Sequence, residues 1–198
     1  MNTVTTSLIT EATFSDDGKK RYTLHKMWDE SKPKLAVIML APSEASAISL
    51  DNSSMLVLNN AFRLGYGSVT ILNLFATLND FSLKQAEDED AENLAVIVAA
   101  CQEADAVVYA AGVGKASNKL FQKRQGQVLA ALRPTEGKLH CLCNENGEAR
   151  LQHPLSPAVR TWYLSPLKVS ELLPTVEDSK DTQKKKVKGK NKPSAKQE

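Results

Sequence analysis

The sequence lacks the features of a membrane or secreted protein. No apolar run among its 198 residues reaches the roughly 18 residues that a membrane span needs. Its start, MNTVTTSLITEATF, has neither a basic segment nor a long apolar segment, so we predict no secretory signal. Only three cysteines occur, and none forms a CxxC pair, which favours reduced thiols. We therefore expect a soluble, cytoplasmic protein that has no membrane partner.

Several catalytic motifs are also missing. No serine lies in the GxSxG pattern of a hydrolase. Gly112-Val113-Gly114-Lys115 is not a phosphate loop, because Tyr109 stands where its first glycine belongs and Ala116 replaces the magnesium-binding hydroxyl. A nucleotide triphosphatase is thus not expected. Two interpretations of this segment stay open, namely an anion site that uses backbone amides from Gly112 together with Lys115, and a plain tight turn.

The histidines and cysteines do not predict a metal site. His140, Cys141, Cys143 and His153 match no usual zinc-finger spacing, and on a strand His140 would point away from the two cysteines. We expect these cysteines to be buried core residues, and we expect neither a metal nor a cofactor.

The net charge of +2 hides a division between body and tail. Residues 179–198 carry eight lysines and two acidic residues, a net +6, which leaves −4 for residues 1–178. With almost no apolar residues, the tail is predicted to be disordered. Two interpretations stay open: a solubilising tail, or an arm that binds nucleic acid. In the second case the binding residues would be Lys184, Lys185, Lys186, Lys188, Lys190 and Lys192.

We predict that residues 1–178 form a single α/β domain, since a chain of 198 residues with 42% apolar content can bury one core. Asp17-Gly18 predicts the turn of a hairpin over about 12–28, at an edge or as a cap, and the core spans about 34–170. Strands are predicted at 34–40, 68–74, 106–110 and 138–143, and helices at 55–64, 87–103, 117–132 and 159–164. This alternation predicts a parallel sheet with helices on both faces. For the first helix the predicted inner residues are Met55, Leu58, Ala61 and Phe62.

The stretch 34–54 is where we expect a ligand site. A buried strand ends there at Ala41-Pro42-Ser43, and in open α/β folds such strand ends face ligands. Glu44 or Asp51 would supply a carboxylate. Two further candidates are Asn73, a polar residue inside an apolar strand, and His153, which lies beside prolines. Singly, these two also fit a hydrogen-bonded core amide and a loop-capping histidine; together they indicate a cleft.

Several short motifs carry a family resemblance. They are Arg21-Tyr22, Trp28, VIMLAPSEAS, Gly65-Tyr66-Gly67, ILNLFA and His153-Pro154-Leu155. Their order and spacing resemble a bacterial and phage family, domain of unknown function 1643, over roughly residues 21–157. That family is in turn distantly similar to the uracil-DNA glycosylase superfamily. The resemblance implies a three-layer sandwich around a four-stranded, mainly parallel sheet of order 2-1-3-4, with the N-terminal hairpin added.

The same resemblance implies roles for individual residues. Asn73 would read the edge of a base, and His153 would stabilise the departing base in a hydrolase. Ala41 stands where the glycosylases position the attacking water. Because alanine can neither orient nor deprotonate water, either Glu44 or Asp51 has taken over this role or hydrolysis has been lost.

We therefore expect a glycosylase-like domain that binds a nucleobase-containing ligand or nucleic acid, with Ala41, Pro42, Ser43, Asn73, Gly112, Lys115 and His153 at the site. Two alternatives stay open. One is an active N-glycosidase, a hydrolase that acts on a modified base of DNA or a nucleoside through Glu44 or Asp51, with His153. The other is a phage or plasmid accessory module that binds a protein partner and has no enzymatic activity.

Overall fold

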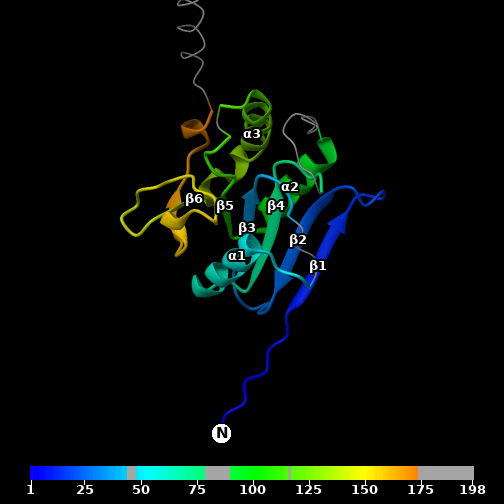
Figure 1. The fold of residues 1–198 in the computed structure, drawn as a ribbon, viewed down its shortest axis with the longest axis vertical. Coiled ribbons are helices and arrows are strands. Elements are labelled where there is room, and N and C mark those ends of the chain that lie inside the picture. The colour runs from blue at the N-terminus through cyan, green and yellow to red at the C-terminus, as the bar shows by residue number, and fades with distance from the viewer. Residues whose placement is uncertain (44–47, 79–89, 116, 174–198) are drawn as a thin grey trace, which may run out of the picture.

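The structure is a computed structural model that describes residues 1–43, 48–78, 90–115 and 117–173. Within this part of the chain, seven strands form one mixed sheet in the order β1-β2-β4-β3-β5-β6-β7 (Figure 1). The strands are β1 (Ile9–Phe14), β2 (Arg21–Met27), β3 (Lys34–Met39), β4 (Ser68–Asn73), β5 (Ala106–Tyr109), β6 (Leu139–Cys143) and β7 (Tyr163–Pro166).

The centre of the sheet consists of the four strands that the sequence predicts. They run parallel in the order β4-β3-β5-β6. A sheet of only four strands is nevertheless wrong, because β2 pairs antiparallel with β4 on one side and β7 pairs antiparallel with β6 on the other. The α/β class is confirmed, whereas the sheet is larger and more mixed than expected.

The helices lie on both faces of this sheet. They are α1 (Asn52–Arg63), α2 (Ala91–Glu103) and α3 (Lys119–Ala131), with single 3-10 segments at Arg133–Lys138, Pro157–Val159 and Val169–Glu171. Residues of α1 pack in one core cluster with Val37 and Val69, and residues of α2 and α3 pack in the other with Ala36 and Leu72. The chain passes from β3 to β4 in one direction and from β4 through β5 to β6 in the opposite one. Right-handed crossovers therefore place α1 on the face opposite to α2 and α3.

The predicted hairpin is confirmed, and it belongs to the main sheet. β1 and β2 are joined by a turn in which Gly18 has a φ of 69°. This left-handed conformation costs glycine little, because glycine has no side chain to clash with the backbone. β1 is the edge strand of the sheet.

The predicted helix at 159–164 is wrong. Only Pro157–Val159 form a short 3-10 turn, after which β7 pairs with β6 from His140↔Pro166 to Cys143↔Tyr163. The four residues of β7 pair with the backbone N–H and C=O groups on the outer edge of β6. The periodicity of a short apolar run does not reveal that such a pairing will form.

The predicted inner face of α1 is wrong at Met55 and Phe62, whereas Ala61 is buried as predicted and Leu58 packs, partly buried, against the core. Its buried residues are Ser54, Val57, Asn60 and Ala61, whereas Met55 and Phe62 are 43% and 64% exposed. Asn60 is buried because its amide donates to the carbonyls of Leu56 and Arg160 and accepts from the Trp162 N–H. A polar residue thus anchors the helix where the hydrophobic pattern suggests an outer position.

None of the helices in the described ranges is long and apolar enough to cross a membrane.

Candidate functional site

The site lies at the carboxyl end of the central parallel strands. The chain leaves β3 through residues 40–43 and leaves β5 through residues 110–115. Connections from these two adjacent strands run to opposite sides of the sheet. This arrangement is the topological switch point, outside which open α/β proteins bind ligands.

Asp51 caps α1 beside the loop that follows β3. Its Oδ1 accepts a hydrogen bond of 2.6 Å from the backbone N–H of Ser54. Burial alone would raise the pKa of Asp51, but the Ser43 hydroxyl, the Ser54 hydrogen bonds and the charge of Arg21 outweigh it, so the pKa is lowered. Asp51 is therefore ionised at neutral pH. Although the Ser43 hydroxyl is near enough to lower this pKa, neither Ser43 Oγ nor Asp51 Oδ2 completes a hydrogen bond of normal geometry with any described residue.

Arg21 is buried next to this carboxylate, with 1% of its surface exposed. Its Nη1 donates to the backbone oxygen of Ser43 at 3.4 Å. Burial lowers the pKa of Arg21, and the nearby charge of Asp51 opposes that shift. The register of β1 and β2 shifts between Thr13↔Thr23 and Phe14↔Arg21, and such irregularities redirect side chains. Arg21 therefore reaches the loop after β3.

Sequence reasoning missed Arg21 as a site residue. It appears there only as part of a family motif at the start of a strand. A buried arginine close to a helix-capping aspartate becomes visible only once the strand irregularity is known.

His153 lies near enough to the same carboxylate to feel its charge. The backbone N–H of Leu155 donates to its Nδ1 at 3.2 Å, so in the neutral ring Nε2 carries the hydrogen and is a donor. Burial lowers the pKa of His153, and Asp51 opposes this shift through its charge. At neutral pH the imidazole is therefore uncharged.

Gly112 holds the end of β5 against His153. Its φ is 79°, and a Cβ added to it would lie 3.2 Å from the Cβ of His153. Glycine is thus required both by the backbone conformation and by the close approach. The structure therefore gathers Arg21, Ser43, Asp51, Gly112 and His153 at one edge of the sheet; we call these five residues the edge cluster.

Asn73 ends β4, one strand away from this cluster. It pairs with Met39 in the parallel ladder, and its side chain is 1% exposed. Its Nδ2 has no hydrogen-bond partner among the described residues. The structure shows no hydrogen bond from the Asn73 side chain to Asp51 or His153.

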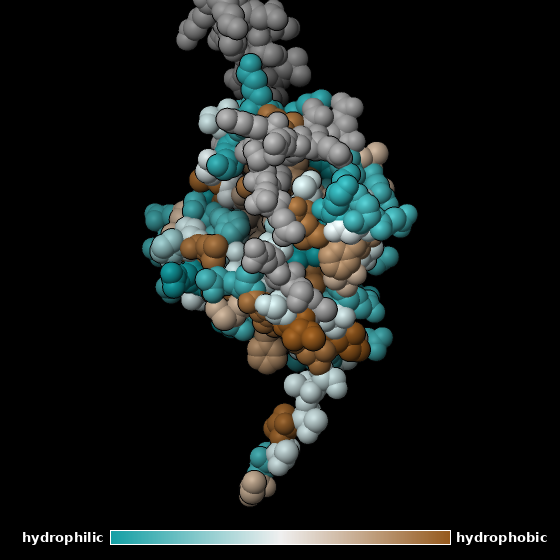
Figure 2. Space-filling view, turned by 45° about the vertical axis from the view of Figure 1, so that its right-hand side comes forward, coloured by the Kyte–Doolittle hydropathy of each residue, from teal (hydrophilic) through white to brown (hydrophobic). Residues whose placement is uncertain are grey.

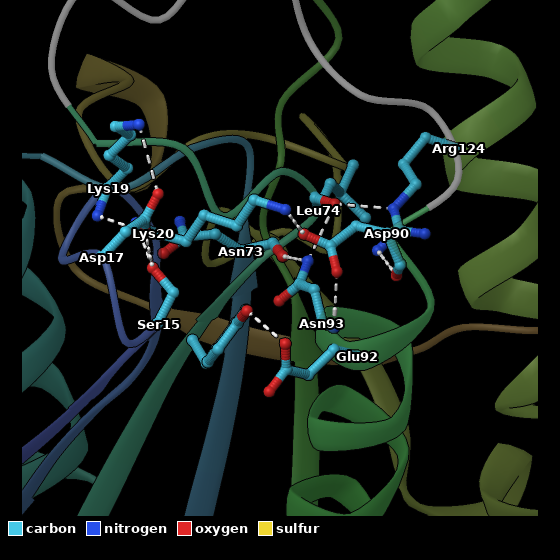
Figure 3. Close-up of polar contacts among 11 residues, drawn as sticks. Ser15, Asp17, Lys19, Lys20, Asn73, Leu74, Asp90, Glu92, Asn93 and Arg124 are labelled. Carbon is cyan, nitrogen blue, oxygen red and sulfur yellow. Dashed lines mark hydrogen bonds and ion pairs between the residues drawn. The ribbon is translucent and has the colours of Figure 1, made fainter.

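A buried polar network supports the backbone at Asn73 from the opposite face (Figure 3). The Nδ2 of Asn93 donates to the carbonyls of Asn73 and Leu74 at 3.0 and 3.2 Å. Arg124 donates from Nε to the Leu74 carbonyl at 2.7 Å and from Nη2 to the Asp90 carbonyl at 3.1 Å. Both side chains are almost fully buried. Because α2 and α3 each hold this strand end, the position of Asn73 is fixed before any ligand arrives.

Asp90 completes this network at the start of α2. Its carboxylate accepts from the Asn93 N–H at 2.9 Å and pairs with the Lys20 ammonium at 3.1 Å. Tyr22 adds a hydrogen bond of 2.6 Å to Glu92 in the first turn of the helix. Sequence reasoning missed this network, because charged residues in helices normally read as a solvated face.

The remaining predicted residues have weaker or undescribed positions. Ala41 and Pro42 follow β3 and bring no polar side chain to the edge, and Lys115 is exposed in a turn. α3 begins at Lys119, and the Asn118 side chain caps it by accepting from the Phe121 N–H. This backbone N–H is therefore already occupied by the protein. Glu44 and all six lysines proposed for nucleic-acid binding lie outside the described residues.

The described ranges contain no group of three or more histidine, cysteine or acidic side chains that could hold a metal ion. The expectation of buried cysteines is confirmed, since Cys101, Cys141 and Cys143 are all buried and free.

Comparison with known proteins gives one family. Residues 21–155 match the family described as "Protein of unknown function (DUF1643)", a span that contains every residue of the edge cluster and Asn73. No curated protein and no solved structure matches the chain.

Proposed function

Since the chain belongs to the DUF1643 family, and the matched span contains the whole edge cluster, we propose that this edge binds a nucleobase-containing ligand, either free or within nucleic acid. We further propose that the domain is a remote relative of the uracil-DNA glycosylase superfamily in which binding persists and hydrolysis has been lost. The observation that carries the proposal is the unpaired amide of Asn73.

A buried amide without a partner is costly. Leaving a buried donor unsatisfied costs about 1–3 kcal/mol, so each such donor calls for an explanation, and a ligand-binding role is one. Asn73 Nδ2 is such a donor, and the network of Asn93 and Arg124 holds the strand end in place. A carbonyl oxygen on a base would accept this hydrogen bond. Because the nitrogen is buried, a ligand that reaches it must displace neighbouring groups.

His153 adds a second donor of suitable chemistry. Its Nε2–H is available because Nδ1 is held by Leu155, and its lowered pKa keeps the ring uncharged near neutral pH. An uncharged donor suits a neutral, carbonyl-bearing base better than it suits a phosphate. Asp51 Oδ2, which has no partner among the described residues, offers an acceptor for an N–H of the same ligand.

We favour binding over hydrolysis because neither Asp51 nor Ala41 is suited to activate a water molecule. The Asp51 carboxylate caps α1, lies near a buried arginine and has a lowered pKa, so it is a weak general base. Ala41 brings no group that could orient a water molecule. The alternative, an N-glycosidase that uses Glu44 or Asp51, predicts base release that this arrangement does not favour.

The first experiment is a calorimetric titration of the full chain with free bases and nucleosides. We expect binding of carbonyl-bearing bases that is lost in Asn73→Leu and weakened in His153→Gln. Asn59→Leu, a change at an exposed asparagine of α1, is the matched control and should bind as the wild type does. Absence of binding across a broad panel of bases, nucleosides and oligonucleotides would contradict the proposal.

A second experiment addresses catalysis. Base release from modified and unmodified DNA is measured for the wild type and for Asp51→Asn, which removes the charge but keeps a good helix cap. We expect no release from either. Release by the wild type that disappears in Asp51→Asn would establish the glycosidase alternative instead.

The lysine-rich tail is a separate part of the proposal. We propose that residues 179–198 contact phosphates when the ligand is nucleic acid. If all six proposed lysines take part, removing the tail should reduce the slope of log affinity against log salt by roughly 5. An unchanged slope would assign the tail to solubility.

A further inference from the structure

We propose that the N-terminal arm of one chain, residues 1–8, docks on an apolar groove of a second copy, so that the protein forms a two-fold dimer through exchanged arms. The groove lies between α1 and the start of β1. Its main apolar residues are Trp28, Leu58 and Phe62, and residues 6–8 form its margin. The inference does not depend on the proposed ligand.

The groove is large and uncharged. It has a volume of about 490 Å³, and its lining residues include no charged side chain. Phe62 is 64% exposed and packs its ring against Trp28, with centroids 6.3 Å apart. Figure 2 shows apolar surface gathered just above the point where the arm leaves the body. Trp28 and Leu58 pack, partly buried, against the core cluster beneath α1, so the groove carries apolar surface from that core out to Phe62. Apolar surface exposed in this way is typical of an interaction surface.

The arm has the chemistry that this groove requires. The sequence MNTVTTSL contains no charged side chain, and Thr3–Thr6 is a run of β-branched residues that favours extended backbone. Figure 1 shows the arm extended away from the body, ahead of the start of β1. Val4 and Leu8 are 87% and 50% exposed. Every second residue of an extended chain faces the same side, so Val4 shares the side of Leu8, which borders the groove.

The strand ladder points to a second copy as the occupant. β1 is the edge strand, so its outer N–H and C=O groups have no ladder partner within the described sheet. The arm continues β1 and has no strand partner there either. A two-fold axis beside the arms would pair the two extended segments antiparallel and would bring each Val4 to the Trp28–Phe62 groove of the other copy. One symmetric contact thereby gives hydrogen-bond partners to the backbone groups of both arms and covers both grooves, as expected for an isologous interface.

The test is the mass of the full chain in solution, measured by light scattering over a range of concentrations. We expect about twice the chain mass of 21.6 kDa. Val4→Asp and Phe62→Asp should each shift the protein to the monomer, because both place a charge in the apolar contact. Val113→Asp is the matched control, since Val113 is 52% exposed at the other end of the sheet. It should remain dimeric. Circular dichroism verifies that each variant is folded.

Disulfide trapping locates the contact. The three native cysteines are buried, so an introduced surface cysteine is the reactive thiol. Val4→Cys chains mixed with Phe62→Cys chains should give a disulfide-linked pair under mild oxidation, whereas Val4→Cys mixed with Val113→Cys should not. A wild type that is monomeric at every concentration, or a dimer that survives both aspartate substitutions, would overturn the proposal.

Discussion

Replacing Asn73 with leucine should stabilise the protein while abolishing ligand binding. The side chain is 1% exposed and its Nδ2 has no partner among the described residues. The substitution removes a donor whose burial costs about 1–3 kcal/mol and introduces an apolar group of similar size beside Met39. We expect a net gain of about 1–2 kcal/mol in the free energy of unfolding. For a chain of this length that gain corresponds to roughly 2–8 °C in the melting temperature.

Asn60→Leu is the control, because Asn60 is also a buried asparagine, 5% exposed, whose amide is fully used. Its side chain makes hydrogen bonds of 2.9, 3.0 and 2.9 Å with Leu56, Arg160 and Trp162. At about 1 kcal/mol for each bond, its loss should destabilise the protein by about 3 kcal/mol. Urea unfolding of both variants gives the comparison. If Asn73→Leu destabilises the protein as much as Asn60→Leu does, the Asn73 amide is already satisfied without a ligand and our reasoning is refuted.

Three further predictions concern the surroundings of Asn73. Because the folded-state pKa of His153 lies below its usual 6.5, the unfolded chain takes up a proton more readily, so stability should fall as the pH drops below about 6.5. His153→Gln should reduce this dependence in unfolding measured between about pH 5 and 8; an unchanged dependence would contradict the burial argument. Gly112→Ala should destabilise the protein by about 1–2 kcal/mol through its φ of 79°, and further through contact with His153. Thermal unfolding should show little change for the control Gly114→Ala, where an added Cβ meets nothing. If Gly112→Ala and Gly114→Ala destabilise the protein equally, the close approach of Gly112 to His153 does not matter for stability. Arg124→Met should cost about 3 kcal/mol, since two buried carbonyls lose charged hydrogen bonds; a negligible cost in urea unfolding would mean that α2 alone holds the end of β4.

The central fold could be predicted because its signals are local. The apolar runs that become β3, β4, β5 and β6 lie between helical segments, and this alternation fixes both the parallel direction and the covering of both faces. Asp17-Gly18 likewise predicts its turn by backbone preference alone. These features need no knowledge of distant contacts.

The extension of the sheet depends on distant contacts. β7 forms because β6 has a free edge, and four residues ending in a proline carry too little periodicity to show it. The inner face of α1 was misjudged in part, at Met55 and Phe62, for a related reason. Asn60 is buried by partners about 100 residues away in sequence, Arg160 and Trp162, and a hydrophobicity pattern contains no trace of them.

The candidate site follows the same division. Asp51, Gly112 and His153 were predicted as site residues, and the structure places Gly112 against His153 and His153 within the electrostatic reach of Asp51. Arg21 was missed because a register shift decides where its side chain lies. The Asn93–Arg124 network was missed because its members are polar helix residues whose burial depends on the packing of α2 against α3.

The most direct test of the binding proposal is the NMR signal of the Asn73 side-chain amide during titration with carbonyl-bearing bases and nucleosides. Its resonances can be assigned from their absence in Asn73→Leu. We predict that they shift as a new hydrogen bond forms, and that the signal of the His153 Nε2–H shifts over the same concentration range. Ligand binding that leaves the Asn73 amide unmoved, or no binding at all, would contradict the claim that this edge of the sheet recognises a nucleobase.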